Sequence, residues 1–247
     1  MSQEIKSAVI FDRVSKAFGP KQVLRDVSFE VPGGEILCIL GRSGTGKSVT
    51  LKLLISLLKP DHGKIWVDGI EITRLKEADL SKVRRKMGFL FQDAALFDSF
   101  TLYENLALPL HRLTDKTQDE IDSIVDRVLG QVGLAGDKQK MPSDLSGGMR
   151  KRAGLARALV LEPKVLLADE PSSGLDRITA AEIDELLLRQ KADRGTTVIV
   201  VTHDVHGARR IGNRFAVFDK GDLVAFGAAS DVEQSENETA RKLISEH

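Results

Sequence analysis

One stretch decides how this chain folds: Gly41-Arg42-Ser43-Gly44-Thr45-Gly46-Lys47-Ser48. It fits the phosphate-loop pattern G-x-x-x-x-G-K-[ST] at every fixed position. The apolar run before it, residues 35–40, is typical of a buried strand, and residues 49–54 are typical of a helix start. Strand, glycine loop and helix form the context in which such a loop binds phosphate. The alternative, a glycine-rich turn that matches by chance, does not explain these flanks.

The loop predicts a nucleotide and a magnesium ion as ligands. We expect its backbone N–H groups to point inward at phosphate oxygens, aided by the positive end of the following helix. Lys47 can reach the β- and γ-phosphates, and the Ser48 hydroxyl can ligate Mg²⁺. The backbone positions expected to bind phosphate are Gly41, Ser43, Gly44, Thr45 and Gly46.

A second apolar run, residues 165–168, ends in the acids Asp169 and Glu170. An acid at the end of a strand beside a phosphate loop can hold Mg²⁺, directly or through water, and Asp169 is the candidate. Glu170 would then face the γ-phosphate as general base for the attacking water. An Asp-Glu pair that merely begins a loop is the alternative, and only the nearby phosphate loop argues against it.

A second pair of glycines lies in Leu145-Ser146-Gly147-Gly148-Met149 and opens a helix rich in basic residues, namely Arg150, Lys151, Arg152 and Arg157. It predicts a second anion site at a helix start. Within a monomer, it is not obvious how one nucleotide could bind both this site and the phosphate loop. The segment resembles the signature motif of ABC-type ATPases, although an ordinary capped helix with a basic face would also fit it. In that family two subunits face head to tail, and each signature caps the ATP held by the other subunit's phosphate loop.

The resemblance extends over roughly residues 8–228 and assigns further roles. Gln92 matches the Q-loop glutamine, which senses Mg²⁺ and the attacking water, and His203 matches the switch histidine, which contacts the γ-phosphate. Asp176, in Ser173-Gly174-Leu175-Asp176, matches the D-loop. Phe18 matches the aromatic residue that stacks on adenine. Outside this order and spacing, the glutamine and the histidine would be read as structural, and Phe18 as a core or edge residue.

Alternating apolar strands and helices predict an α/β fold with a mainly parallel core sheet. Residues 9–11 and 27–31 are expected to form an antiparallel β edge, and 64–69 a strand and turn. The pattern becomes mostly helical from Glu77 to about Gly136, so we expect a helical insert within the ATPase domain 8–228, at about residues 93–160. Other expected elements are helices 49–58, 119–132, 148–158 and 179–191 and strand 197–201. Residues 229–247 form a tail with a short helix at 239–244.

Composition limits the class of protein. The 247 residues carry 36 Lys plus Arg and 36 Asp plus Glu, a formal net charge of zero, which argues against a general nucleic-acid-binding protein.

The single cysteine, Cys38, lies in an apolar strand and is expected to be a buried hydrophobe. No apolar run approaches the ~18 residues that would span a bilayer. Residues 1–6 lack the apolar segment of a signal peptide. We expect a cytoplasmic protein that reaches the inner membrane through a partner.

No protein-only metal site is expected. The four histidines outside the switch position have no convincing metal-ligand spacing: His62, His111, His206 and His247.

By the resemblance, ATP holds two copies together as a homodimer, and hydrolysis passes motion to a membrane permease. The expected docking surface follows Gln92, within residues 93–105, where a related permease inserts a short coupling helix. Five apolar or aromatic residues lie close together there: Leu96, Phe97, Phe100, Leu102 and Tyr103. The alternative is that they pack the core of the insert itself.

Several local features resemble the MlaF-like branch of the Mla and Mce systems, which move phospholipids or related hydrophobic molecules between bacterial membranes. They are Met149, where most relatives have glutamine, and the stretches 91–99 and 169–180. The resemblance implies an MlaE-like permease, a periplasmic MCE-domain protein and, as an optional third partner, a small STAS-domain subunit. Arg177 departs from the proline of many relatives. The tail of this branch can reach the opposite subunit, so residues 240–244 either do so or fray.

Two other functions stay open. Importers of amino acids or other small solutes share nearly every catalytic motif, and a solute-binding protein as partner would distinguish them. A soluble ABC protein that acts on ribosomes or in DNA repair usually has paired ATPase units or a long coiled-coil insert. This chain has neither, and its zero net charge argues against that class.

Overall fold

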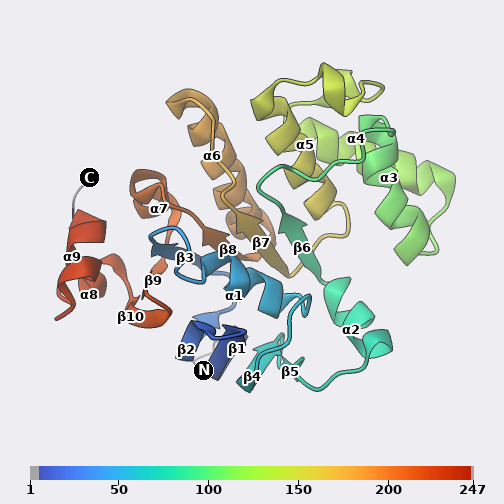
Figure 1. Ribbon diagram of the computed structural model, residues 1–247. Coiled ribbons are helices and arrows are strands. Elements are labelled where there is room, and N and C mark those ends of the chain that lie inside the picture. The colour runs from blue at the N-terminus through green and yellow to red at the C-terminus, as the bar shows by residue number, and fades with distance from the viewer. Residues whose placement is uncertain (1–5, 246–247) are drawn as a thin grey trace, which may run out of the picture.

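The computed structural model describes residues 6–245 and has a six-stranded sheet at its centre (Figure 1). The strand order is β10-β9-β3-β8-β7-β6, and all neighbours are parallel except the β9–β10 hairpin. The strands are β3 (Ile36–Gly41), β6 (Met87–Leu90), β7 (Val165–Asp169), β8 (Thr197–Val201), β9 (Arg214–Asp219) and β10 (Asp222–Gly227). The predicted α/β fold with a mainly parallel sheet is confirmed.

Strand β6 corrects the prediction that the chain turns mostly helical from Glu77. After α2 (Glu77–Arg84) the chain returns to the core sheet, where β6 pairs in parallel with β7. A four-residue strand is too short to show periodicity, so the helical segments on both sides dominated the pattern.

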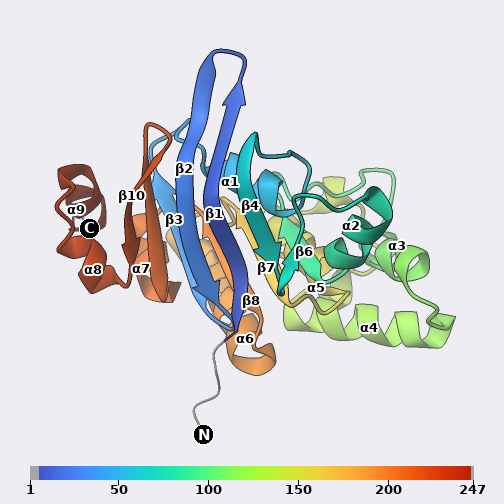
Figure 2. The same ribbon diagram turned by 90° about the horizontal axis from the view of Figure 1, so that it is seen from below.

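A second, antiparallel sheet lies against the first and has the order β2-β1-β4-β5. Its strands are β1 (Ser7–Phe18), β2 (Lys21–Pro32), β4 (His62–Val67) and β5 (Ile70–Glu71). The predicted antiparallel pairing of β1 with β2 is confirmed, but both strands are longer than expected and form a projecting hairpin (Figure 2). The rings of Phe11 and Phe29 stack across this pair at 4.6 Å between centroids.

Both faces of the core sheet are covered, which explains why its strands are continuously apolar. On one face, Leu37 and Ile39 of β3 belong to a buried cluster with the antiparallel sheet and α1 (Lys47–Leu54). On the other face, Cys38 and Leu40 pack in a cluster with the helices. Successive side chains of a strand point to opposite faces of the sheet, so the position of a residue in β3 decides which of the two layers its side chain packs against. Helix α1 ends four residues earlier than predicted.

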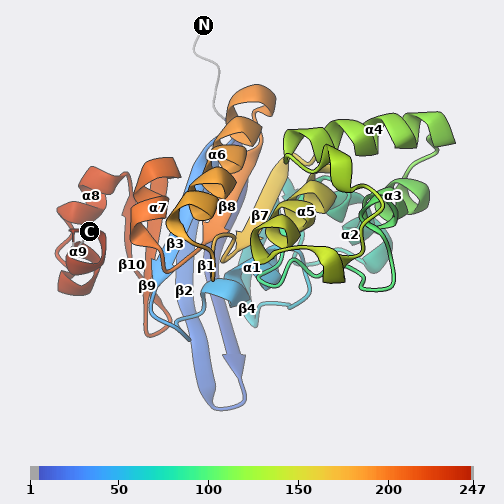
Figure 3. The ribbon, with the colours of Figure 1, turned by 90° about the horizontal axis from the view of Figure 1, so that it is seen from above.

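The larger helices on the Cys38 and Leu40 side of the core sheet form two groups (Figure 3). Helices α6 (Arg177–Arg194) and α7 (Val205–Ile211) lie over the face of the sheet. Helices α3 (Leu102–Leu113), α4 (Gln118–Gln131) and α5 (Gly147–Leu159) form a lobe beyond β6, joined by the short 3-10 turns Ala135–Asp137 and Pro142–Asp144. Capping boxes begin α3 at Thr101 and α4 at Thr117. The helices predicted at 119–132, 148–158 and 179–191 are confirmed, and α6 is a few residues longer.

The tail forms α8 (Ala229–Glu233) and α9 (Glu238–Ser245) beside the β10 edge (Figure 1). Ala240 and Ile244 are fully buried in the helical cluster, and Arg209 donates a hydrogen bond to the Ile244 carbonyl at 2.6 Å. The expectation that residues 240–244 fray is therefore wrong. A contact of the tail with a second copy stays a prediction, and His247 lies outside the described residues. Within residues 6–245, no helix combines the length and apolarity needed to cross a membrane.

Candidate functional site

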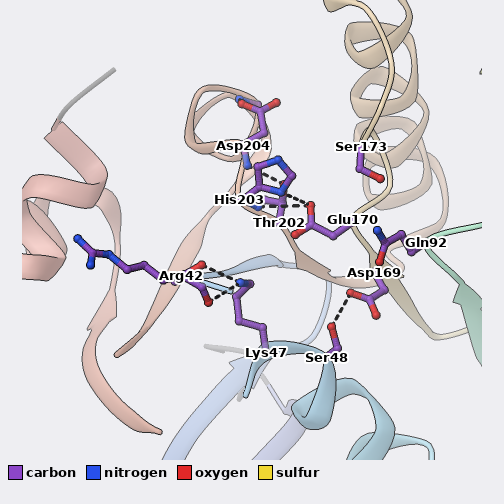
Figure 4. A network of polar contacts seen from close by, with 12 residues as sticks. Arg42, Lys47, Ser48, Gln92, Asp169, Glu170, Ser173, Thr202, His203 and Asp204 are labelled. Atoms are coloured by element: carbon purple, nitrogen blue, oxygen red, sulfur yellow. Dashed lines mark hydrogen bonds and ion pairs between the residues drawn. The ribbon is translucent and has the colours of Figure 1, made fainter. Parts of the chain in front are cut away.

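The predicted catalytic residues gather at one edge of the core sheet. The carboxyl ends of β3, β6, β7 and β8 lead directly into the phosphate loop, Gln92, Asp169 with Glu170, and His203. Ligands of open parallel sheets bind at this edge. Figure 4 shows Lys47 and Ser48 below, and Glu170 and His203 above, in one neighbourhood.

The phosphate loop has a backbone that only glycine fits at Gly46. This residue has φ 107°, and a Cβ there would lie 2.6 Å from Leu24 Cδ2 and 2.8 Å from the Val23 carbonyl oxygen. Gly46 is the N-cap of α1, and within the described chain it provides no side-chain cap, and the first turn of the helix has no acidic residue. Its first N–H groups lack partners within the helix, so they are available to an anion.

Lys47 is buried within the loop and is held by backbone oxygens. Its Nζ donates to the carbonyls of Gly41 at 2.7 Å and Arg42 at 3.1 Å. Burial lowers the pKa of Lys47, and the nearby carboxylates of Glu170 and Asp169 oppose that shift. An anionic phosphate beside this ammonium would favour its charged form further.

Ser48 and Asp169 lie close enough to share one cation. The Ser48 hydroxyl donates to Asp169 Oδ1 at 3.0 Å, from the start of α1 to the end of β7. Burial raises the pKa of Asp169, the hydrogen bond from Ser48 opposes this, and the charge of Glu170 adds to it. Oxygen ligands of this kind suit Mg²⁺, which is usually held by one or two protein groups together with substrate phosphates. Residues 6–245 contain no group of three His, Cys, Asp or Glu side chains that could hold a metal alone.

Glu170 is held in a strained conformation next to His203. Its φ is 49°, in the left-handed region, and its N–H donates to the Val201 carbonyl at 2.8 Å. The carboxylate Oε2 lies 2.8 Å from His203 Nδ1 (Figure 4). The Glu170 side chain is 14% exposed, whereas that of His203 is 72% exposed. Backbone strain of this kind costs about 1–3 kcal/mol and persists only where the surroundings hold the residue firmly.

Phe18 lies at the tip of the β1–β2 hairpin and borders a cavity of about 290 Å³. The opposite wall of this cavity is the phosphate loop and the start of α1. The ring is 46% exposed, and Lys16 Nζ lies 5.5 Å from its centroid. An exposed ring at this place is suited to stacking on a nucleobase. Of the two alternatives, the exposure excludes a core residue, while an edge residue stays open.

The second predicted anion site lies at the start of α5. Ser146 caps this helix, and its hydroxyl accepts a hydrogen bond from the Met149 N–H at 3.2 Å. Gly148 has no room for a side chain, because a Cβ would lie 2.5 Å from Thr179 Cγ2 of α6. Gly147 is the first residue of the helix. In the described part of the chain, no hydrogen bond or ion pair joins this segment to the phosphate loop.

Asp176 also caps a helix rather than joining the site described above. Its Oδ1 accepts from the N–H groups of Ile178 and Thr179, both at 3.0 Å, and its Oδ2 accepts from the Thr179 hydroxyl at 2.7 Å. These hydrogen bonds, led by those from Thr179, lower the pKa of Asp176. The structure thus brings together Phe18, the phosphate loop, Gln92, Asp169, Glu170 and His203. Within residues 6–245, no hydrogen bond or ion pair joins Ser146–Gly148 or Asp176 to these residues.

Sequence reasoning gave Lys151 no role of its own and named it only among the basic residues of this helix. Its side chain is buried, and Nζ donates to the carbonyls of Gln92 and Glu170 and to Ser173 Oγ. A signal existed in the helical period, because Lys151 precedes the buried Leu155 by four residues and therefore shares its face.

A family model described as ABC transporter matches residues 24–173, more than half of the chain. The chain belongs to the ABC transporter family. The predicted family is thereby confirmed. This match does not distinguish the MlaF-like branch from other branches of the family.

Curated relatives support the same family. The "Probable ribonucleotide transport ATP-binding protein mkl" of Mycobacterium leprae is 44% identical over 94% of this chain and 67% of its own length. The "Methionine import ATP-binding protein MetN" of Rhizobium meliloti is 42% identical over 96% and 68%. The chain spans about two thirds of the length of the curated relatives it matches, 64% in the mkl protein of Mycobacterium bovis.

Solved structures agree with the fold. The ATP-binding cassette MJ0796, in a dimeric post-hydrolysis state bound to ADP and Pi, has a TM-score of 0.83 at 33% identity, over 89% of this chain and 98% of that one. The cassette cbiO1 of Clostridium perfringens has a TM-score of 0.85 at 30% identity, over 96% and 94%. Together with the family match, these similarities establish an ATP-binding, ATP-hydrolysing domain.

Proposed function

We propose that two copies of this chain bind two ATP molecules between them, head to tail, and hydrolyse them to drive a membrane transporter. One observation carries this proposal: a single chain has two glycine-rich helix starts suited to anions, at α1 and α5, and within residues 6–245 no hydrogen bond joins them. In the dimer, the α5 start of one copy would cap the nucleotide held by the loop of the other. The dimeric state of the MJ0796 cassette supports this arrangement.

In the proposed reaction, a water molecule attacks the γ-phosphorus and the bond to the β–γ bridging oxygen breaks. Glu170 takes the proton of the water, ADP leaves, and inorganic phosphate remains. Lys47 and the N–H groups of α1 neutralise the phosphate charge. The bound Mg²⁺ would polarise the phosphates, and Ser48, Asp169 and Gln92 would hold it. His203 would orient the Glu170 carboxylate through the 2.8 Å contact and, as the family resemblance implies, would contact the γ-phosphate.

The permease is proposed to dock beside β6. A groove of about 520 Å³ lies between this strand and α3, and its lining includes Phe89, Phe91, Phe97 and Pro109. Phe97 is 49% exposed. Two of the residues expected on this surface belong to the insert's own packing, because Leu102 is fully buried and the Tyr103 hydroxyl bonds to Asp122. Docking here would keep the chain on the cytoplasmic face of the inner membrane.

For the cargo, we propose phospholipid or a related hydrophobic molecule, with an MlaE-like permease, a periplasmic MCE-domain protein and an optional STAS-domain subunit. The support is the local sequence, Met149 and residues 94–99, in which the chain resembles the MlaF-like branch. Import of a small solute is the second candidate, favoured by the 42% identity to a methionine import protein and by the ribonucleotide transport named for mkl.

A mild-detergent pull-down of the tagged chain from its native membranes, with mass spectrometry of proteins and lipids, separates the two. A permease, an MCE-domain protein and enriched phospholipid support lipid transport. A solute-binding protein with a different permease refutes the lipid cargo and leaves the ATPase mechanism unchanged. Recovery with ribosomes and absence from membranes would refute the transporter function itself.

A further inference from the structure

Lys151 connects three segments that the ATPase site needs. Its Nζ donates to the carbonyl of Gln92 after β6, to the carbonyl of Glu170 after β7 at 3.0 Å, and to Ser173 Oγ at 3.2 Å. The residue is only 7% exposed. Its three acceptors match the three N–H donors of an ammonium group, so this cation is fully satisfied without a carboxylate partner.

Two of the three acceptors are backbone carbonyls of residues with proposed roles in water activation, Gln92 and Glu170. The Glu170 carbonyl belongs to the residue with φ 49°, whose strain needs support from its surroundings. Lys151 supplies that support from one side, while the hydrogen bond from the Glu170 N–H to Val201 supplies it from the other. Without the ammonium, two partly buried hydrogen bonds to backbone carbonyls would be lost, and Glu170 would be free to relax.

Lys151 also lies on the helix that begins with the second anion site. It follows Ser146 by five residues, which is about 7.5 Å along the axis of α5. A phosphate that binds at the start of α5 therefore acts on the same rigid helix that holds Gln92 and Glu170.

We infer that Lys151 is a positioning residue that couples occupancy of the α5 start to the placement of the Glu170 carboxylate. This inference rests on the proposed ATPase mechanism and adds to it a route between the two halves of the composite site. A shift of about 1 Å in a reacting group lowers the rate roughly a hundredfold, so a small movement of α5 is enough to control hydrolysis.

Two substitutions test the inference in the complex pulled down from native membranes. Lys151→Met keeps the length and apolar stem without the donors, and Lys151→Gln keeps two N–H donors for the three acceptors. The matched control is Lys164→Met, because Lys164 is exposed, pairs with Asp68 and lies at the opposite end of β7. We expect Lys151→Met to lower kcat roughly tenfold to a hundredfold and to leave the KM for ATP within about twofold, with a smaller fall in kcat for Lys151→Gln.

The outcomes separate this inference from the proposed function. If both Lys151 variants match Lys164→Met in kcat, Lys151 does not position the site. If kcat, ATP affinity and the thermal midpoint fall together in Lys151→Gln, its role is structural support alone and the inference is wrong. Glu170→Gln serves as the reference. If the wild-type complex and the Glu170→Gln complex hydrolyse ATP at the same rate, the proposed mechanism is wrong, and the Lys151 inference is wrong with it.

Discussion

Replacing Glu170 by glutamine tests the proposed general base directly. Glutamine has nearly the shape of glutamate, so it fits the same 14% exposed position, and its side-chain oxygen can still accept a hydrogen bond from His203. The Lys151 and Val201 contacts involve only the backbone of residue 170 and are kept. The substitution therefore removes one property, the ability to take a proton from water.

The expected loss follows from that single change. A positioned general base contributes about 10²–10⁴ in rate, equivalent to about 3–5 kcal/mol of activation free energy. We expect phosphate release at saturating MgATP to fall by that factor, while the dissociation constant for ATP stays within about threefold. With hydrolysis blocked, ATP should hold two copies together, which light scattering coupled to size exclusion would detect as a doubled mass.

The control is Glu185→Gln. Glu185 is an exposed residue of α6, and its one ion pair within residues 6–245 is with Arg189, one turn away, so the substitution should change neither turnover nor mass. Turnover of Glu170→Gln within about threefold of the unchanged protein would remove Glu170 from the role of base. A slow variant that stays monomeric with ATP would instead contradict the head-to-tail dimer.

Three further predictions concern the surroundings of the site. Phe18→Ala should weaken ATP binding by about 1–3 kcal/mol in calorimetry, with kcat unchanged at saturation, and an unchanged affinity would contradict stacking. Ile244→Ala should lower the free energy of unfolding by about 2–5 kcal/mol, more than Leu243→Ala on the same helix, whereas equal effects would mean that α9 is not docked as described. Burial raises the pKa of the Cys38 thiol, so a thiol reagent should react only after denaturant is added, and rapid reaction of the native protein would contradict its burial.

The nucleotide-binding edge could be predicted from the sequence because its parts are local. A phosphate loop, two acids after an apolar run and a histidine after the next strand each need only a few adjacent residues. Parallel strands then bring their carboxyl ends to one edge, which is a property of the fold class and not of particular contacts. The contact between Ser48 and Asp169 follows from that geometry.

The features that the sequence did not predict depend on contacts between segments that are far apart along the chain. Strand β6 is four residues long, and its partner β7 follows almost eighty residues later, so no local pattern marks it. The burial of α9 depends on Arg209, which hydrogen-bonds the Ile244 carbonyl and pairs with Glu233. The sequence did not predict the burial of Lys151, because lysine is almost never fully buried without a partner. Its partners are carbonyl oxygens, which a sequence pattern does not reveal.

The structure also changes the meaning of the second anion site. Ser146 caps α5 and Asp176 caps α6, and these two helix starts pack together where Gly148 meets Thr179. ATP bound to the phosphate loop of the second copy would therefore contact two capped helix starts that pack against each other. Through Lys151 this unit reaches the backbone of the proposed base. Displacing either helix start should therefore change hydrolysis before it changes the affinity of the phosphate loop for ATP, because that loop lies on a different element.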